Sequence, residues 1–440
     1  MTPSSRCLRS EPKEGERVMN SFPRVRVAVA LVLPLVHVGR AAEPVDSCFS
    51  DLPPGCSITR SYLVSGVQRS SIAQKLGTPL SKLSNTFLKV NGASIRVNIM
   101  ETRTAAEAAT LHKVITAMKG NPVFCLLRGQ RVIEFCRTTP STAIRTAYEL
   151  GFVQKPARVR YRVTAQLATV EQADYMSLNE LSNVFFKANT RTPGADSKGR
   201  VEELLEAFSF GRTLSLRSDR AFLRPARYVF RPPPRKTVRA GQGTARYEFE
   251  GLPAVLGVPS VQLQAEISCN SSGQTPADRS RARHLLVATD HWPVNDPEVQ
   301  ALAQEITAGK ETQADQIQAI LRWLQPNRNI ASSGKRGSRW GVKRVLGQRY
   351  GHCWDSSDCF VTLCRATGIP ARQVGGWLFG GCGHVWAEVL MEGKTWQQVD
   401  PTGGGRVPCG VFHIPYFTTE TGDMPILYLS MPEIEILETR

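Results

Sequence analysis

The sequence lacks an apolar run long enough to cross a bilayer as a stable helix. It has no internal repeat, no acidic loop of the calcium-binding pattern D-x-D/N-x-D/N-G and no recognisable nucleic-acid-binding motif. The closely spaced Cys and His pairs of structural zinc sites are also missing. These absences argue against a transmembrane anchor and against nucleic acid as a partner, and we expect neither a metal nor a cofactor.

Residues 1–42 have the pattern of a secretory signal peptide. Basic Arg24 and Arg26 precede a short apolar run at 27–36, and small residues follow near Ala41 and Ala42. Met19 would make a more ordinary start than Met1, so the start codon stays open. We therefore expect an exported protein, either periplasmic or extracellular.

The chain carries a large excess of positive charge, with 55 Lys and Arg against 38 Asp and Glu, a formal net charge of +17. Removing residues 1–42 removes seven basic and three acidic residues, which leaves about +13. Such a charge suits work near anionic cell-envelope polymers. The basic residues are scattered, however, so an ordinary solvated surface is the preferred interpretation.

Export would permit disulfide bonds among the 11 cysteines. Connectivity cannot be deduced from the sequence, and an odd number remains for pairing once the signal segment and one free nucleophile are subtracted. The plausible pairs are Cys48–Cys56, Cys125–Cys136 and Cys382–Cys409, with Cys353–Cys382 as an alternative to the last.

Two regions precede the C-terminal motifs. Residues 43–155 read as a small α/β domain of unknown role, with strands at 95–99 and 132–135, a helix from a Thr104–Glu107 capping box to Gly120, and a helix at 141–150. Residues 156–282 are β-rich and sandwich-like, because apolar residues alternate at 159–167 and at 261–267. A catalytic domain is expected at 283–440, opening with helices capped by Asp296 and Thr312.

Cys353, His384 and Asp400 follow one another in contexts that suit a nucleophile, a base and an orienting acid. After the turn at Gly351, helical spacing of apolar residues predicts a helix that begins at Cys353 and stops near Gly368. The thiol would then lie in the first turn, where free N–H groups and the helix dipole favour a thiolate.

The base and the acid fall on two strands of a predicted hairpin, 384–390 and 394–400. With a three-residue loop ending in left-handed Gly393, Leu390 would pair with Lys394. Stepping back along both strands then places His384 directly opposite Asp400, within reach of a hydrogen bond.

These motifs resemble the transglutaminase-like superfamily. The matching segments are Arg349–Trp354, Gly368–Arg372, His384–Glu388 and Trp396–Thr402. The resemblance implies an α+β fold with a C-terminal papain-like core, after the β-rich and the small α/β domains. It also implies Cys353 as nucleophile, His384 as base and Asp400 as its orienter, and it suggests Trp354 and Trp386 as oxyanion or substrate-cleft residues.

The resemblance implies chemistry at an acyl carbon and a protein or peptide substrate. Its members include cross-linking transglutaminases, peptidases and amidases. The C-terminal barrels and the calcium loops of the vertebrate-type enzymes are missing here, and His352 replaces the Gln that often precedes their nucleophile. We therefore expect hydrolysis rather than glutamyl transfer. The alternatives are a non-catalytic envelope scaffold and a metal site built from Cys353, His384 and nearby cysteines, although the Cys spacing disfavours the latter.

Overall fold

The computed structural model describes residues 49, 52, 56–90, 93–119, 124–136, 138, 140–173, 203, 205–206, 208–218, 221–222, 226–240, 243–255, 257–277, 284–324, 331–332, 339–380, 383–403, 409–423 and 426–440. The expected signal segment, 1–42, lies outside these residues. No helix within them is both long and apolar enough to cross a membrane.

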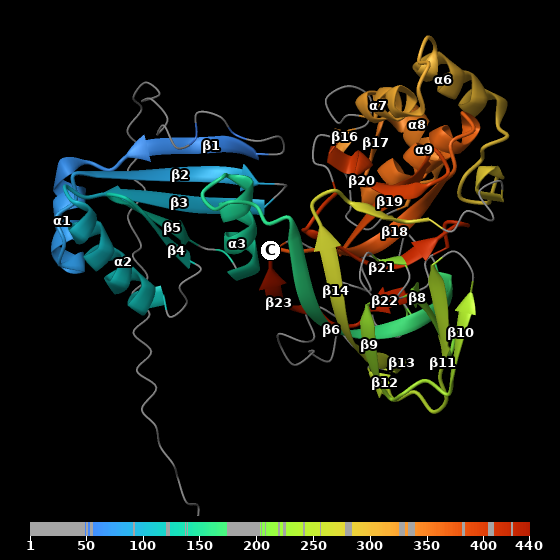
Figure 1. Ribbon diagram of the computed structural model, residues 1–440, viewed down its shortest axis with the longest axis horizontal. Helices are drawn as coiled ribbons and strands as arrows, with labels where there is room; N and C mark the ends of the chain where they lie inside the picture. Colours follow the sequence, from blue (N-terminus) through green and yellow to red (C-terminus); the bar gives the residue numbers. More distant parts are fainter. Residues whose placement is uncertain are drawn as a thin grey trace, which may run out of the picture. The chain divides into compact units, whose positions relative to one another are not determined.

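The first region is a five-stranded antiparallel sheet with three helices, in the strand order β1-β2-β3-β5-β4 (Figure 1). Its elements are β1 (Cys56–Leu63), α1 (Gly66–Leu76), β2 (Lys82–Val90), β3 (Ala93–Glu101), α2 (Ala105–Lys119), β4 (Cys125–Arg128), β5 (Arg131–Cys136) and α3 (Pro140–Glu149). The predicted capping box is confirmed. Glu107 Oε2 accepts the Thr104 N–H at 3.1 Å, and Thr104 Oγ1 accepts the Glu107 N–H at 3.1 Å.

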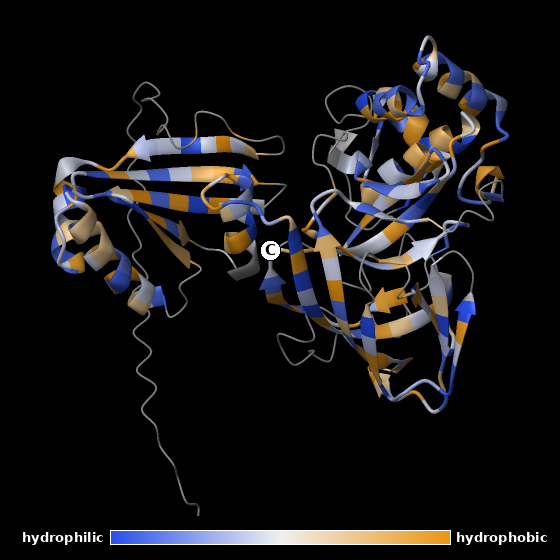
Figure 2. Cartoon of the chain, in the orientation of Figure 1, coloured by the Kyte–Doolittle hydropathy of each residue, from blue (hydrophilic) through white to orange (hydrophobic). Residues whose placement is uncertain are grey.

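The second region is built around two long strands, β6 (Arg158–Ala173) and β14 (Val261–Asn270). They pair antiparallel, with Tyr161 opposite Ile267, and the predicted alternation is confirmed by apolar residues that are buried in both strands. Figure 2 shows the alternating colour along them. The shorter strands are β7 (Phe208–Phe210), β8 (Thr213–Arg217), β9 (Arg227–Arg231), β10 (Lys236–Ala240), β11 (Thr244–Glu248), β12 (Ala254–Val255) and β13 (Val258–Pro259).

The β-rich region also takes strands from the end of the sequence. β22 (Ile426–Tyr428) and β23 (Glu433–Thr439) both pair with β6, and β7 pairs with β6 as well. Conversely, β15 (Gln274–Pro276) pairs with β20 of the following region. Each of the two sheets therefore contains strands from both sides of residue 282.

The third region places helices against a sheet of order β15-β20-β19-β18-β21. Its elements are α6 (Pro297–Thr307), α7 (Gln313–Trp323), β16 (Ala331–Ser332), α8 (Val342–Gln348), β17 (Tyr350–Gly351), α9 (Cys353–Ala366), β18 (Ala371–Leu378), β19 (Gly383–Met391), β20 (Thr395–Val399), the 3₁₀ turn η5 (Pro401–Gly403) and β21 (His413–Thr419). Asp296 and Thr312 cap α6 and α7 as predicted. The α+β fold is confirmed.

One hydrophobic core joins the second and third regions. It includes Leu263 from β14, Trp377 from β18 and Ile414 from β21. Tyr161 also donates from its hydroxyl to the Val411 carbonyl at 2.8 Å. The sheet that carries His384 is thereby packed against the β-rich sheet.

The eight described cysteines all carry free thiols. The predicted Cys125–Cys136 disulfide is wrong: Cys125 lies opposite Glu134 across the β4–β5 pair, which leaves Cys136 two positions further along. Cys48 and Cys382 lie outside the described residues, and their expected partners Cys56 and Cys409 are free.

Candidate active site

The thiol of Cys353 sits at the first position of α9, as the sequence predicts. The next twelve residues of the helix, Trp354–Arg365, are all buried, whereas Cys353 is partly exposed. A thiol in this position faces the unpaired N–H groups and the positive end of the helix dipole. The helix therefore presents the Cys353 thiol at the edge of the core.

Asp355 fixes the turn that leads into α9. Its Oδ2 accepts the His352 N–H at 3.0 Å, and its Oδ1 accepts the Trp340 N–H at 2.7 Å. Burial raises the pKa of this carboxyl to about 6, although both backbone hydrogen bonds act in the opposite direction. A Cβ on Gly351 would lie 2.5 Å from Cβ of Asp355, so a side chain at 351 would displace the cap.

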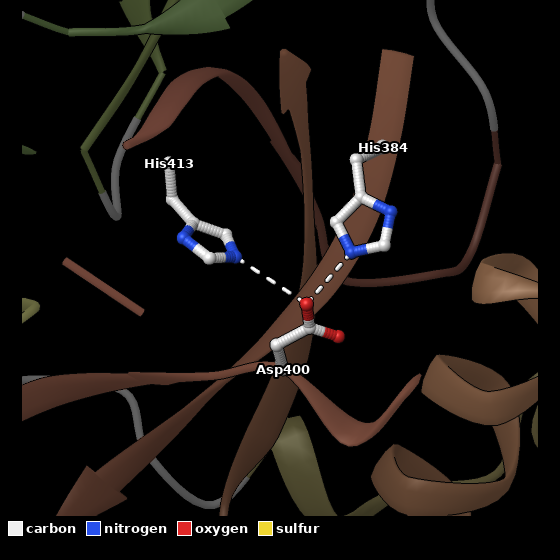
Figure 3. A group of neighbouring side chains, drawn as sticks. All are labelled: His384, Asp400 and His413. Carbon is white, nitrogen blue, oxygen red and sulfur yellow. Dashed lines mark hydrogen bonds and ion pairs between the residues drawn. The ribbon is translucent and has the colours of Figure 1, made fainter. Parts of the chain in front are cut away.

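His384 and Asp400 meet at the open end of the β19–β20 pair. The Nε2 atom of His384 lies 2.8 Å from Oδ2 of Asp400 (Figure 3). The second carboxylate oxygen, Oδ1, accepts the Thr402 N–H at 3.0 Å. The predicted pairing register is wrong, because Leu390 lies opposite Trp396 rather than Lys394. The offset is two residues, which preserves the face and therefore the contact.

The charges of the site are arranged around the His384 ring. Burial alone would favour the neutral ring, but the Asp400 carboxylate and the side chain of Cys353 outweigh it and hold the pKa of His384 well above its ordinary value. Burial would likewise raise the pKa of Asp400, yet His384 and His413 hold it far below its usual range. The surroundings of His384 therefore favour the charged imidazolium over the neutral ring.

A second imidazole, His413, also points at Asp400. Its Nε2 lies 3.4 Å from the same Oδ2 atom, and the residue is buried at the start of β21 (Figure 3). Sequence reasoning missed it. The only signal is a single His in the otherwise apolar stretch 411–417, and nothing in that spacing points to Asp400.

The same segments carry the similarity to known proteins. The transglutaminase-like superfamily model matches residues 300–401, which include all three predicted catalytic residues. Residues 300–401 form a transglutaminase-like domain.

Two curated relatives match a short part of this domain. Both are peptide-N(4)-(N-acetyl-beta-glucosaminyl)asparagine amidases, one from Gallus gallus (38% identical over 60 residues, 13% of this chain) and one from Drosophila melanogaster (37% over 62 residues, 14%). The chain covers 9% of the length of each relative.

Two solved structures are also similar. A candidate cysteine protease from Cytophaga hutchinsonii has a TM-score of 0.38 and 14% identity, covering 65% of this chain and 93% of that one. A candidate protease from Parabacteroides distasonis has a TM-score of 0.23 and 10% identity, covering 73% and 68%.

Trp386 and Trp354, the two tryptophans expected at the substrate cleft, are both buried. Trp386 is 0% exposed, and its Nε1–H donates to Oε1 of Gln398 at 3.1 Å. It therefore presents no wall to a substrate, contrary to the expectation. Its ring lies 6.1 Å from that of His384 in a stacked arrangement, so it supports the imidazole from below. Trp354 is also buried, with the Arg339 guanidinium 4.8 Å from its ring centre.

A buried network of hydrogen bonds around Asp358 fixes the position of α9. Asp358 receives both nitrogens of the Arg339 fork at 2.6 Å. The Trp292 indole donates to it at 2.8 Å and the Gln373 amide at 2.6 Å. Asp358 lies five residues after Cys353 on α9, and Gln373 is on β18. This network therefore holds the start of α9 in place against β18.

His384, Asp400 and His413 also form a group whose ligand atoms lie within 4.8 Å of one another, and in the described part of the chain it is the group that could hold a metal ion. Two imidazoles and a carboxylate are suitable ligands for zinc or iron. A nitrogen that donates a proton to Asp400 has no lone pair left for a metal, however. A metal here would displace the hydrogen bond between His384 and Asp400.

Proposed function

We propose that this chain is an exported cysteine hydrolase that cleaves amide bonds in a protein or peptide substrate. The observation that carries the proposal is His384, held by Asp400 on one side and interacting with Cys353 on the other. The relatives are named as amidases, which supports an amide as the bond that is broken. The Asp400 carboxylate, rather than a metal, would stabilise the charged base.

The reaction follows from these positions. In the charged pair His384 already holds the proton of Cys353, and the thiolate attacks the carbonyl carbon of the amide. The N–H of Cys353 at the start of α9 is a donor for the oxygen that becomes negative. As the carbon–nitrogen bond breaks, His384 returns its proton to the leaving amine, and a thioester forms on Cys353.

Water then completes the cycle. His384 removes a proton from a water molecule that attacks the thioester, and the thiol leaves with that proton as the carboxylic acid is released. Transfer to an amine would need a site that admits the amine and excludes water. The buried position of Trp386 takes away one wall of such a site, which favours hydrolysis over glutamyl transfer.

One experiment separates hydrolysis from transfer. The protein lacking residues 1–42 is incubated with a glutamine-containing protein, an N-glycosylated peptide and a tagged primary amine, and the products are followed by mass spectrometry. We expect cleavage or deamidation that is lost in Cys353→Ala. Amine incorporation that outruns hydrolysis would overturn the preference, and folded protein with no Cys353-dependent product would favour a scaffold.

Export is tested separately, in the cell. We expect the mature N-terminus close to residue 42 in periplasmic or secreted material, determined by N-terminal sequencing. A full-length chain that remains inside the cell would contradict this part of the proposal.

A further inference from the structure

His413 reaches the Asp400 carboxylate on the same face of the sheet as His384, but from β21, two strands away from β19. β18 lies between the two strands: Gly376 pairs with His384 on β19, while Leu378 pairs with His413 on β21. Both imidazoles then converge on one atom, Oδ2 of Asp400, at 2.8 Å and 3.4 Å. The side chain of His413 is 3% exposed, so it has no access to bulk water and no direct route to a substrate.

We propose that His413 is a positioning residue that fixes the Asp400 carboxylate, so that the Cys353–His384 pair keeps its charged form through the reaction. This inference rests on the proposed function, because it concerns the same three residues. It assigns His413 no contact with substrate. Its action passes through Asp400 alone.

The protonation of the cluster supports this role. The groups that face His413 are Asp400, His384 and Arg145 of α3, and the indole of Trp386 packs edge-on at 5.1 Å. Burial, together with the cations His384 and Arg145, keeps the pKa of His413 below its ordinary value in spite of Asp400. A neutral ring has one N–H, and only the tautomer with that proton on Nε2 can donate to Asp400.

Asp400 is consequently held at both oxygens by groups other than the base: Oδ1 by the Thr402 N–H and Oδ2 by His413. A carboxylate held at one oxygen only could rotate about its last bond as the charge on His384 comes and goes. Small misplacements of this kind cost large factors in rate. Without His413 the carboxylate could turn away from His384, which would weaken the hydrogen bond that stabilises the imidazolium, so His384 would lose its proton at a lower pH.

The test uses His413→Phe, which removes the donor and keeps a planar ring, and His413→Gln, whose amide nitrogen can stand in for Nε2. The first readout is the rate of Cys353 alkylation by iodoacetamide against pH, with the site identified by peptide mapping. It needs no substrate. The alkaline limit of the reactive ion pair is the pH at which His384 loses its proton. We expect this limit to fall by about one pH unit in His413→Phe and to return towards the wild-type value in His413→Gln.

The second readout is turnover on the substrate identified above. We expect kcat of His413→Phe to fall by about 10- to 100-fold with little change in KM. An alkaline limit that is unchanged or raised, in variants whose thermal unfolding matches wild type, would overturn the inference. If His413→Phe does not fold, His413→Gln is compared with His413→Asn, because Asn places its amide nearer to Nδ1 than to Nε2. Equal pH profiles of these two variants would contradict the inference.

The two proposals fail in different ways. If wild-type Cys353 shows no pH-dependent activation, the proposed catalytic function is wrong whatever His413 does. If wild type shows it and His413→Phe leaves it unaltered, only the positioning role is wrong.

Discussion

His384 and Asp400 lie diagonally across the β19–β20 pair rather than directly opposite each other. Ala387 pairs with Val399, so the position opposite His384 falls two residues beyond Asp400, past the end of β20. Asp400 thus sits where the ladder ends and the η5 turn begins. The carboxylate owes its place to that turn as much as to the sheet, and the Thr402 N–H provides the link.

Replacing Asp400 by Asn should slow the reaction without abolishing it. The neutral amide cannot stabilise the His384 imidazolium, so the pKa of His384 falls and the reactive pair is less populated. We expect kcat/KM to fall by roughly 10²- to 10⁴-fold. Cys353→Ala, assayed beside it, should form no acyl-enzyme at all. Equal residual activity in the two variants would contradict the assigned roles.

The cap on α9 should make stability depend on pH. The pKa of Asp355 is raised to about 6, so the folded state binds this proton more tightly than the unfolded state does. The free energy of unfolding therefore falls as pH rises from about 4 to about 6. Asn cannot ionise. Between pH 6 and pH 4, wild type should gain on the order of 3 kcal/mol relative to Asp355→Asn, as measured by urea unfolding. A difference that stays flat, or that grows with pH, would count against the shift.

Gly376 should tolerate no side chain. A Cβ there would lie 2.1 Å from the Ile414 carbonyl oxygen and 2.7 Å from the Trp386 ring. Since the first contact is with backbone, β18 and β21 would have to separate behind His384. We expect Gly376→Ala to destabilise the protein by about 1–3 kcal/mol and also to lower its activity. Gly383→Ala is the matched control, because its Cβ would meet Trp377 at an ordinary 3.4 Å.

The buried ion pair between β8 and β19 should be costly to break. Glu388 is 0% exposed and lies 2.8 Å from Arg217, also 0% exposed, and 2.9 Å from Arg372. Arg217→Met leaves the carboxylate with less compensation, and we expect a loss of about 3–5 kcal/mol in the free energy of unfolding. Arg246→Met, at an exposed position on β11, should change it by less than about 0.5 kcal/mol. Similar losses in both would show that the pair carries no special weight.

The sequence predicts those parts of the site that depend on local rules. The start of α9 follows from the turn at Gly351 and from helical spacing, and the shared face of His384 and Asp400 follows from the period of two along a strand. The hairpin register was wrong because both Glu392 and Gly393 take positive φ, 46° and 66°, whereas the prediction assumed a left-handed residue at Gly393 alone.

His413 could not be predicted, because its place depends on which strands become neighbours. It lies 13 residues beyond Asp400 and returns on β21, whose neighbour in the sheet is β18 rather than β20. The same holds for Arg217, which precedes its partner Glu388 by 171 positions and reaches it from the β-rich region. Such contacts depend on strand order within a sheet for His413 and on packing between sheets for Arg217, and periodicity along the chain encodes neither.

The edge of β6 that receives β22 and β23 has a consequence for the newborn chain. Thr164 pairs with Glu433 and Thr169 with Ile426, so this edge waits for partners that are made more than 250 residues later. At roughly 5–20 residues per second, the delay during synthesis is on the order of 10–50 s. For that time the strand has only one side of its ladder filled, and an exposed edge invites pairing with other chains. During synthesis, this edge of β6 must therefore be kept from pairing with other chains until β22 and β23 have been made.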